Sequence, residues 1–132
     1  MKTITIIGSG MMGSALAFPA RENGNEVRLV GTHLDREIIE KCKQTNRHPK
    51  FNRDFPEGIT YYQIEELEQA INGADFIICG VSSFGVEWFK DEILPKLYEN
   101  IPVISVTKGL MNTPDGTLLT YLDIWQEKLN EL

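Results

Sequence analysis

The most constraining feature of this chain is a glycine-rich hexapeptide, Gly8-Ser9-Gly10-Met11-Met12-Gly13, close to its first residue. The hexapeptide follows an apolar, β-branched run at residues 4–7 and leads directly into the small-residue stretch 14–17. It matches the pattern G-x-G-x-x-G at a point where a strand ends and a helix begins at once. The chain is therefore expected to begin with a tightly bent strand–helix unit.

Each glycine of the hexapeptide has a separate mechanical role in such a bend. Gly8 permits the tight turn, Gly10 lets a pyrophosphate approach the backbone, and Gly13 lets the helix pack closely on the strand. The unpaired N–H groups at the helix start, together with its dipole, attract phosphate. We therefore predict that residues 8–13 bind a dinucleotide; the alternative is an ordinary glycine-rich turn that binds nothing.

Composition limits the other classes of function. The 132 residues suit one domain, and a net charge of −6 argues against a nucleic-acid or anionic-membrane surface. No leader precedes the first strand, and the apolar stretch at residues 76–81 is too short to span a bilayer, so we expect a cytoplasmic protein. Cys42 and Cys79 have neither metal-ligand spacing nor a disulfide framework, so no metal site is predicted.

Hydrophobic periodicity and turn residues divide the chain into alternating strands and helices. The predicted strands are residues 3–7, 26–30, 59–62, 74–79 and 102–107. The predicted helices are residues 11–23, 34–46, 64–71, 86–98 and 118–132, with a loop at 47–58. Pro19 should kink the first helix, and Pro95 should kink or end the fourth.

This alternation predicts an α/β fold, a Rossmann-type doubly wound parallel sheet in three layers, α/β/α. Right-handed crossovers give the strand order 3-2-1-4-5. Ligands in such sheets bind beyond the carboxyl ends of the strands. We therefore expect residues 8–13, 31–35, 80–85 and 108–109 to meet at one edge.

The end of the second strand bears on cofactor choice. NAD-selective sites usually carry an acid there, whereas this chain has Gly31-Thr32-His33-Leu34-Asp35. Asp35 comes late and can simply cap the following helix. Thr32 and His33 can hydrogen-bond a ribose or its 2′-phosphate with help from Arg36, so NADP is slightly favoured over NAD. For His33 and Arg36, solvated surface positions are an equal alternative.

Two further segments follow strands. Ser82 and Ser83 are small enough to leave room for the cofactor, although at least one of them is expected to cap the next helix. Lys108 follows the fifth strand, where its ammonium can hold a phosphate or polarise a carbonyl. His48 lies in a basic cluster at residues 47–50 that can touch substrate, but it is expected to be solvated. Trp88 and Trp125 are expected in the core or buried against a neighbour.

These segments, with Thr107-Lys108-Gly109-Leu110 as the most specific, resemble the N-terminal domain of NAD(P)-dependent glycerol-3-phosphate dehydrogenases over essentially the whole chain. The resemblance implies that Met11, Met12, Thr32 and Lys108 contact the cofactor, and that Lys108 also contacts glycerol phosphate. It implies reversible hydride transfer between NAD(P)H and dihydroxyacetone phosphate. In the family a second, helical domain carries the proton-transfer lysine; this chain is expected to lack that domain, so no catalytic residue is assigned within it.

The sequence departs from the family where Val81-Ser82-Ser83 replaces Val-Pro-Ser and where Met12 replaces an aromatic residue. Two alternatives stay open. One is another small hydroxy-acid dehydrogenase, similar to ketopantoate reductase, and the other is a stand-alone nucleotide-binding module without turnover. The face that the missing domain would cover is expected to favour a homo-oligomer.

Overall fold

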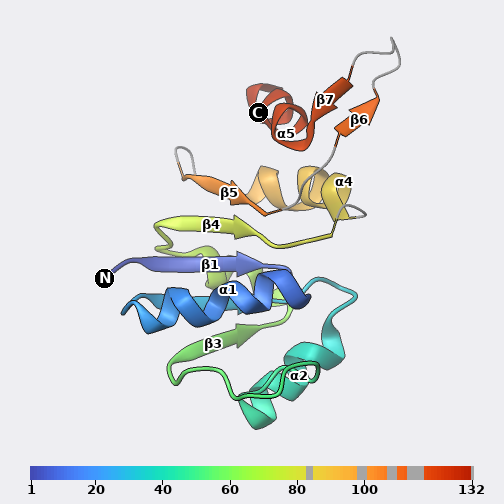
Figure 1. The fold of residues 1–132 in the computed structure, drawn as a ribbon. Helices are drawn as coiled ribbons and strands as arrows, with labels where there is room; N and C mark the ends of the chain where they lie inside the picture. The colour runs from blue at the N-terminus through green and yellow to red at the C-terminus, as the bar shows by residue number, and fades with distance from the viewer. Residues whose placement is uncertain (83–84, 98–100, 107–109, 113–117, 132) are drawn as a thin grey trace.

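The computed structural model describes residues 1–82, 85–97, 101–106, 110–112 and 118–131. Its centre is a parallel sheet with the order β3-β2-β1-β4-β5 (Figure 1). The five strands are β1 (Thr3–Ile7), β2 (Glu26–Val30), β3 (Ile59–Tyr62), β4 (Phe76–Cys79) and β5 (Val103–Ser105). The predicted strands and their order are confirmed, with β4 and β5 shorter than expected.

Helices connect these strands. They are α1 (Met11–Glu22), α2 (Arg36–Thr45), η1 (Ile64–Glu66), α3 (Leu67–Ile71), α4 (Val86–Trp88), η3 (Phe89–Ile93) and η4 (Leu94–Lys96), with α5 (Tyr121–Glu131) after them. The helix predicted at residues 86–98 is divided into α, π and 3-10 turns. Pro95 lies at the start of the last turn, where its missing N–H cannot continue an α-helical ladder.

The last part of the chain differs from the prediction. Residues 118–120 form β7 (Leu118–Thr120) rather than the start of a helix, and β7 pairs antiparallel with β6 (Leu110–Asn112). The final helix α5 is fixed by Trp125, which is 3% exposed, packs on Phe89 and donates a hydrogen bond from Nε1 to the Val86 carbonyl. The core position expected for Trp125 is confirmed.

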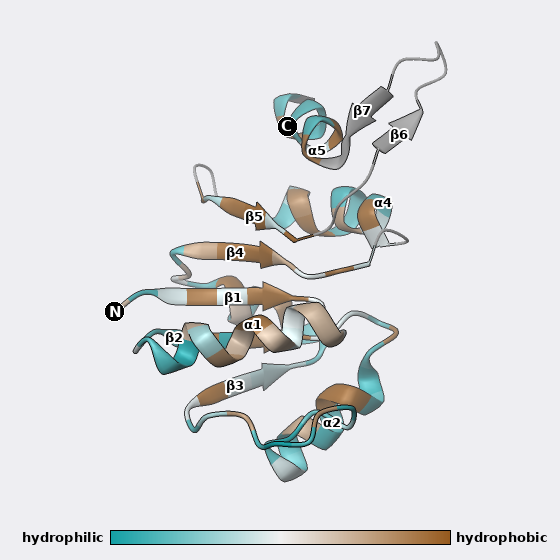
Figure 2. Cartoon of the chain, in the orientation of Figure 1, coloured by the Kyte–Doolittle hydropathy of each residue, from teal (hydrophilic) through white to brown (hydrophobic). Residues whose placement is uncertain are grey.

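Two hydrophobic cores lie on opposite faces of the sheet. Ile6 and Leu29 belong to the core under α1 and α2, whereas their neighbours Ile7 and Val30 belong to the core under α3, η3 and α5. Adjacent residues of a strand point to opposite faces, so both must be apolar when both faces are covered. Figure 2 shows this apolar character along β1, β4 and β5.

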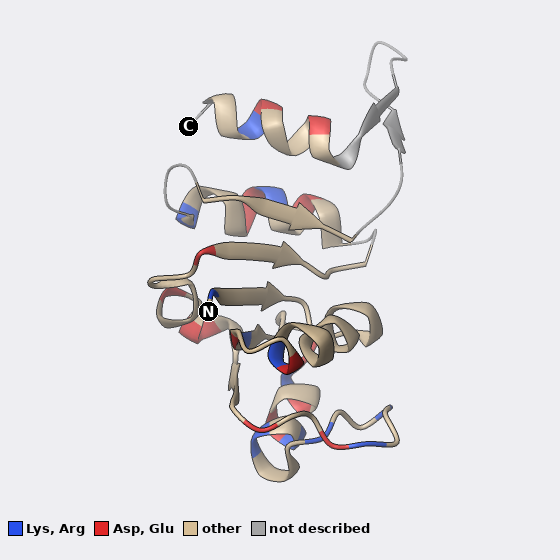
Figure 3. Cartoon of the chain, turned by 60° about the vertical axis from the view of Figure 1, so that its left-hand side comes forward, with Lys and Arg blue, Asp and Glu red and all other residues tan. Residues whose placement is uncertain are grey.

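Charged residues lie mainly on the helices and connecting loops, and the strands are almost free of them (Figure 3). Among the described residues, no helix is both long and apolar enough to cross a membrane. Helices cover both faces of the sheet in a three-layer α/β/α arrangement, and the loops after β1, β2 and β4 lie at the carboxyl edge of the sheet.

Candidate functional site

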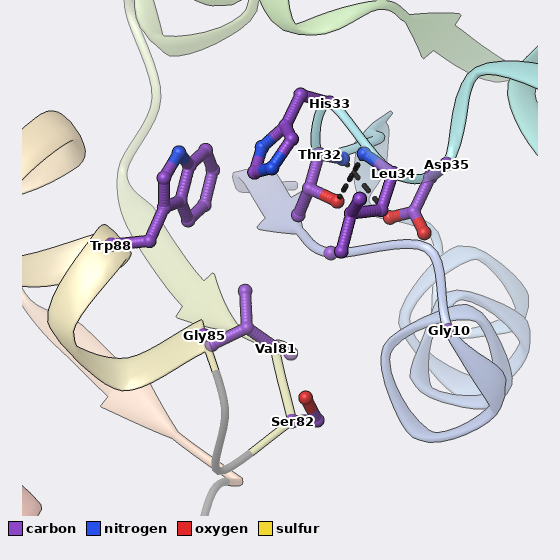
Figure 4. A pocket seen from close by; sticks show the side chains of 11 residues that line it. Gly10, Thr32, His33, Leu34, Asp35, Val81, Ser82, Gly85 and Trp88 are labelled. Carbon is purple, nitrogen blue, oxygen red and sulfur yellow. Dashed lines mark hydrogen bonds between the residues drawn. The ribbon is translucent and has the colours of Figure 1, made fainter.

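A cavity of about 280 Å³ opens at the carboxyl edge of the sheet, beyond the ends of β1, β2 and β4 (Figure 4). Its lining includes five residues expected from the sequence: Gly8, Gly10, Thr32, His33 and Ser82. Its other lining residues are Leu34, Asp35, Gly80, Val81, Gly85 and Trp88. The structure thus brings together three of the loops that were expected to meet.

Close backbone packing fixes the floor of this cavity. Gly8 has a φ of +107°, and a Cβ there would lie 2.8 Å from the Gly80 carbonyl carbon. A Cβ on Gly13 would lie 2.1 Å from the Gly8 carbonyl oxygen. The turn and packing roles expected of Gly8 and Gly13 therefore agree with the structure. Sequence reasoning missed Gly80 as their partner, although its position directly after a buried strand beside β1 was a usable signal.

Gly10 has a different environment. It is the N-cap of α1 with a φ of −66°, which any residue can adopt, and a Cβ there would meet no atom within 4 Å. The fold therefore does not require glycine at this position, but a ligand that approaches the backbone would. Met11 and Met12 follow in the first turn of α1 with 51% and 60% of their surfaces exposed. The first N–H groups of a helix have no partner within it.

Ser9 is buried between these glycines and does not line the cavity. Its N–H donates to the Asp35 carboxylate at 3.1 Å, and its carbonyl accepts from Ser14 Oγ and His48 Nε2, each at 2.9 Å. The structure thus gives the Ser9 backbone a place in the scaffold of the turn. Its cofactor-binding role stays a prediction.

By its sequence position Asp35 can cap α2, and the structure bears this out only for its place in the chain. It holds the N-cap position. Its side chain makes no hydrogen bond to the helix; instead its Oδ2 accepts the Ser9 N–H at 3.1 Å. The same oxygen accepts the Thr32 N–H at 3.0 Å (Figure 4). This carboxylate therefore ties the glycine-rich turn to the loop after β2. The turn lies 26 residues earlier in the chain, so no local pattern could indicate the contact.

The loop after β2 forms one wall of the cavity. Thr32 Oγ1 accepts the Leu34 N–H at 3.2 Å. The exposed ring of His33 lies beside the ring of Trp88, with 5.8 Å between the two ring centroids. Figure 4 shows the rings of His33 and Trp88 near each other, on the side of the cavity away from Gly10. Trp88 is half-buried: it packs against the core under α3, η3 and α5, as expected, and it also lines the cavity.

Arg36 forms an ion pair with Glu65 and does not line the cavity. The described lining therefore contains one carboxylate and one imidazole but neither lysine nor arginine. A phosphate in this cavity would depend on backbone N–H groups rather than on a cationic side chain from the described part of the chain.

Ser82 lines the cavity, and its carbonyl accepts the Gly85 N–H at 2.8 Å. The N-cap of α4 is Gly85, without a side-chain hydrogen bond, so capping by Ser82 is not seen. Ser83 and Lys108 lie outside the described residues, and their predicted roles stay predictions.

His48 was expected to be solvated, and this is wrong: its side chain is completely buried. The ring stacks on Phe51 with 4.7 Å between centroids, in an aromatic cluster that includes Phe18 and Phe55. These aromatic side chains fold the loop at residues 47–58 back over α1, which explains why a residue from a charged loop becomes buried.

The chemistry of the remaining groups is limited. Burial raises the pKa of the Cys42 thiol to about 11, which leaves it protonated and a poor nucleophile at neutral pH. Among the described residues, no group of three His, Cys, Asp or Glu side chains is placed to hold a metal ion.

Comparisons with known proteins agree on one family. Residues 3–132 match the model of the NAD-dependent glycerol-3-phosphate dehydrogenase N-terminus. The NADP(+)-dependent glycerol-3-phosphate dehydrogenase of Archaeoglobus fulgidus is 34% identical over 125 residues, which are 95% of this chain and 37% of that protein. The glycerol-3-phosphate dehydrogenase [NAD(P)+] of Shouchella clausii is 33% identical over 110 residues, 83% of this chain and 32% of that protein.

Solved structures show the same fold. Glycerol-3-phosphate dehydrogenase from Coxiella burnetii superposes with a TM-score of 0.81 at 23% identity, over 97% of this chain and 38% of that chain. A 2-dehydropantoate 2-reductase from Enterococcus faecalis gives a TM-score of 0.66 at 25% identity, over 97% and 37%. The chain spans about a third of the length of the curated relatives above. On the match of the family model over residues 3–132, this chain belongs to the family of NAD-dependent glycerol-3-phosphate dehydrogenase N-termini.

Proposed function

We propose that the cavity at the carboxyl edge of the sheet binds NAD(P)H, as part of an enzyme that interconverts dihydroxyacetone phosphate and glycerol 3-phosphate. The observation that carries this proposal is Gly10, where a side chain would meet open space although the backbone is ordinary. A glycine with no steric role in the fold is explained by a ligand that must reach the backbone.

The residues present fit a dinucleotide. The N–H groups of Gly10, Met11 and Met12 would hold the diphosphate at the start of α1, and Gly8 and Gly13 keep that turn tight. The hydroxyl of Thr32 and the ring of His33 would bind the adenosine ribose, with Ser82 on the opposite wall. The backbone of Ser9 would support the turn. When bound, the nicotinamide supplies or accepts the hydride.

Lys108 is proposed on sequence grounds as the contact to both cofactor and substrate phosphate. It follows the fifth strand in the sequence, and an ammonium there would hold a phosphate and stabilise negative charge on the substrate oxygen. We assign no proton-transfer residue to this chain, and we propose that this group lies in a helical domain beyond the present sequence.

NADP(H) is proposed as the slightly preferred cofactor. The tip of β2 carries no carboxylate to repel a ribose 2′-phosphate, and the later Asp35 carboxylate is engaged by the N–H groups of Ser9 and Thr32. The relative from Archaeoglobus fulgidus, which covers most of this chain, is described as NADP(+)-dependent. Among the described residues that line the cavity, His33 is the basic side chain.

The test is a titration of the 132-residue chain with NADPH and NADH, followed by the fluorescence of the reduced nicotinamide. Binding of both, with NADPH tighter, is expected. Failure of both at millimolar concentration would remove the binding assignment. Steady-state assays of the full-length enzyme with dihydroxyacetone phosphate and with ketopantoate then separate the proposed substrate from that of the related reductase fold.

We also propose a cytoplasmic location, which suits the buried free thiol of Cys42 because cytosolic proteins keep cysteines reduced. Association of two copies through an apolar face is the remaining expectation from the sequence. Light scattering at high protein concentration tests it, and a monomer would contradict it.

A further inference from the structure

The carbonyl oxygen of Ser9 receives two side-chain hydrogen bonds from distant parts of the chain. His48 Nε2 lies 2.9 Å from it, and Ser14 Oγ also lies 2.9 Å from it. All three residues are completely buried. The proposed function gives His48 and Ser14 no role, yet both converge on the centre of the glycine-rich turn.

The hydrogen bonds of His48 define its tautomer. The Lys50 N–H donates to Nδ1 at 3.0 Å, so Nδ1 carries a lone pair and the ring proton lies on Nε2. That proton is therefore donated to the Ser9 carbonyl. The ring cannot easily turn away, because it also stacks on Phe51 at an interplanar angle of 26°.

Fixing this carbonyl also fixes the following N–H group. The Ser9 carbonyl and the Gly10 N–H belong to one planar trans peptide unit, in which C=O and N–H point in opposite directions. When His48 and Ser14 hold the oxygen toward the buried side, the Gly10 N–H must point away from it. Gly10 lines the cavity. The preceding peptide unit is fixed as well, by the bond from the Ser9 N–H to Asp35.

We propose that His48, together with Ser14, is a positioning residue for the dinucleotide, because its hydrogen bond to the Ser9 carbonyl holds the Gly10 N–H toward the cofactor diphosphate. This inference rests on the proposed function. A peptide unit that is already oriented need not be ordered when the ligand binds, and this lowers the free-energy cost of binding.

Two substitutions of His48 separate its two hydrogen bonds. His48→Gln can place an amide nitrogen near the position of Nε2 and so keep a donor for the Ser9 carbonyl. His48→Asn can keep an acceptor for the Lys50 N–H but is too short to reach Ser9. We expect the Kd for NADPH to rise about tenfold or more in His48→Asn and to stay within about threefold of wild type in His48→Gln. The amide resonance of Gly10 in the free protein should shift strongly only in His48→Asn.

The outcomes are distinct. If the wild-type chain binds neither NADPH nor NADH, the proposed function fails and the inference fails with it. If the wild type binds and folded His48→Asn binds equally well, the inference alone is overturned. It is also overturned if both variants weaken binding equally, since His48 would then act through ring packing. Should His48→Asn not fold, Ser14→Ala decides: a rise in Kd of about threefold supports the inference, and an unchanged Kd refutes it.

Discussion

Replacing Gly10 by alanine should separate the needs of the fold from those of the ligand. In the free protein the new methyl group meets no atom within 4 Å. Alanine is a poorer N-cap than glycine, which costs up to about 1 kcal/mol. It also lowers the entropy of the unfolded chain, which returns about 0.4–1 kcal/mol. The free energy of unfolding of Gly10→Ala should therefore stay within about 1 kcal/mol of wild type.

Binding should respond much more strongly. A methyl group in the space before the Gly10 N–H would push the diphosphate away from at least one backbone donor. A hydrogen bond to a charged group contributes about 1.5–3 kcal/mol, so the Kd for NADPH should rise at least about tenfold. Nicotinamide fluorescence measures this Kd, and urea unfolding followed by circular dichroism measures the stability.

Gly13→Ala is the matched control because its Cβ would lie 2.1 Å from the backbone oxygen of Gly8. Backbone cannot move aside as a flexible side chain can, so the strain should outweigh the gain in helix propensity of about 1 kcal/mol. We expect Gly13→Ala to lose about 2 kcal/mol or more of stability. Wild-type affinity in folded Gly10→Ala would refute the placement of the diphosphate, and wild-type stability in Gly13→Ala would refute the packing argument.

Three further predictions concern stability. Burial raises the pKa of the Cys42 thiol from 9.0 to about 11, so on raising the pH the thiol ionises first in the unfolded chain. The free energy of unfolding should therefore fall between these two pH values, and it should fall less in Cys42→Ala. Urea unfolding at a series of pH values measures this difference. Hydrogen bonds from the Gln63 N–H and then from Lys43 lower the pKa of Glu66. The stability that its carboxylate contributes is therefore present above pH 4.5 and is lost as the pH falls below this value. If Glu66→Gln loses as much stability on acidification as wild type in the same titration, this prediction is contradicted. Trp125→Ala should lower the free energy of unfolding by about 3–5 kcal/mol, because it removes the ring contact with Phe89 and the hydrogen bond to the Val86 carbonyl. An unchanged melting temperature in calorimetry would argue against α5 as part of the core.

Much of the fold could be predicted from the sequence because it depends on local patterns. The bend at Gly8 needs a positive φ, and the glycine spacing at residues 8–13 indicates it directly. The paired apolar residues Ile6-Ile7 and Leu29-Val30 predict strands covered on both faces. Once strands and helices alternate, right-handed crossovers leave few strand orders, and the order found is the expected one.

The limits of local pattern appear at β7 and at Trp88. Residues 118–120 read Leu-Leu-Thr, a short run that suits a helix or a strand, and the pairing of β7 with β6 decided between them. Trp88 packs against the core as expected, but its ring also lies beside His33 at the cavity, a contact between distant segments that no local pattern indicates.

The sequence by itself determined the sheet, its order and the position of the glycine-rich turn at the carboxyl edge. Only the tertiary structure decided what holds that turn. Asp35 reaches Ser9 across 26 residues and His48 reaches it across 39, and both side chains look like ordinary solvated or capping residues in their own segments. A buried hydrogen bond between distant segments depends on how the loops pack, because a buried polar group must find whatever partner the completed fold places beside it.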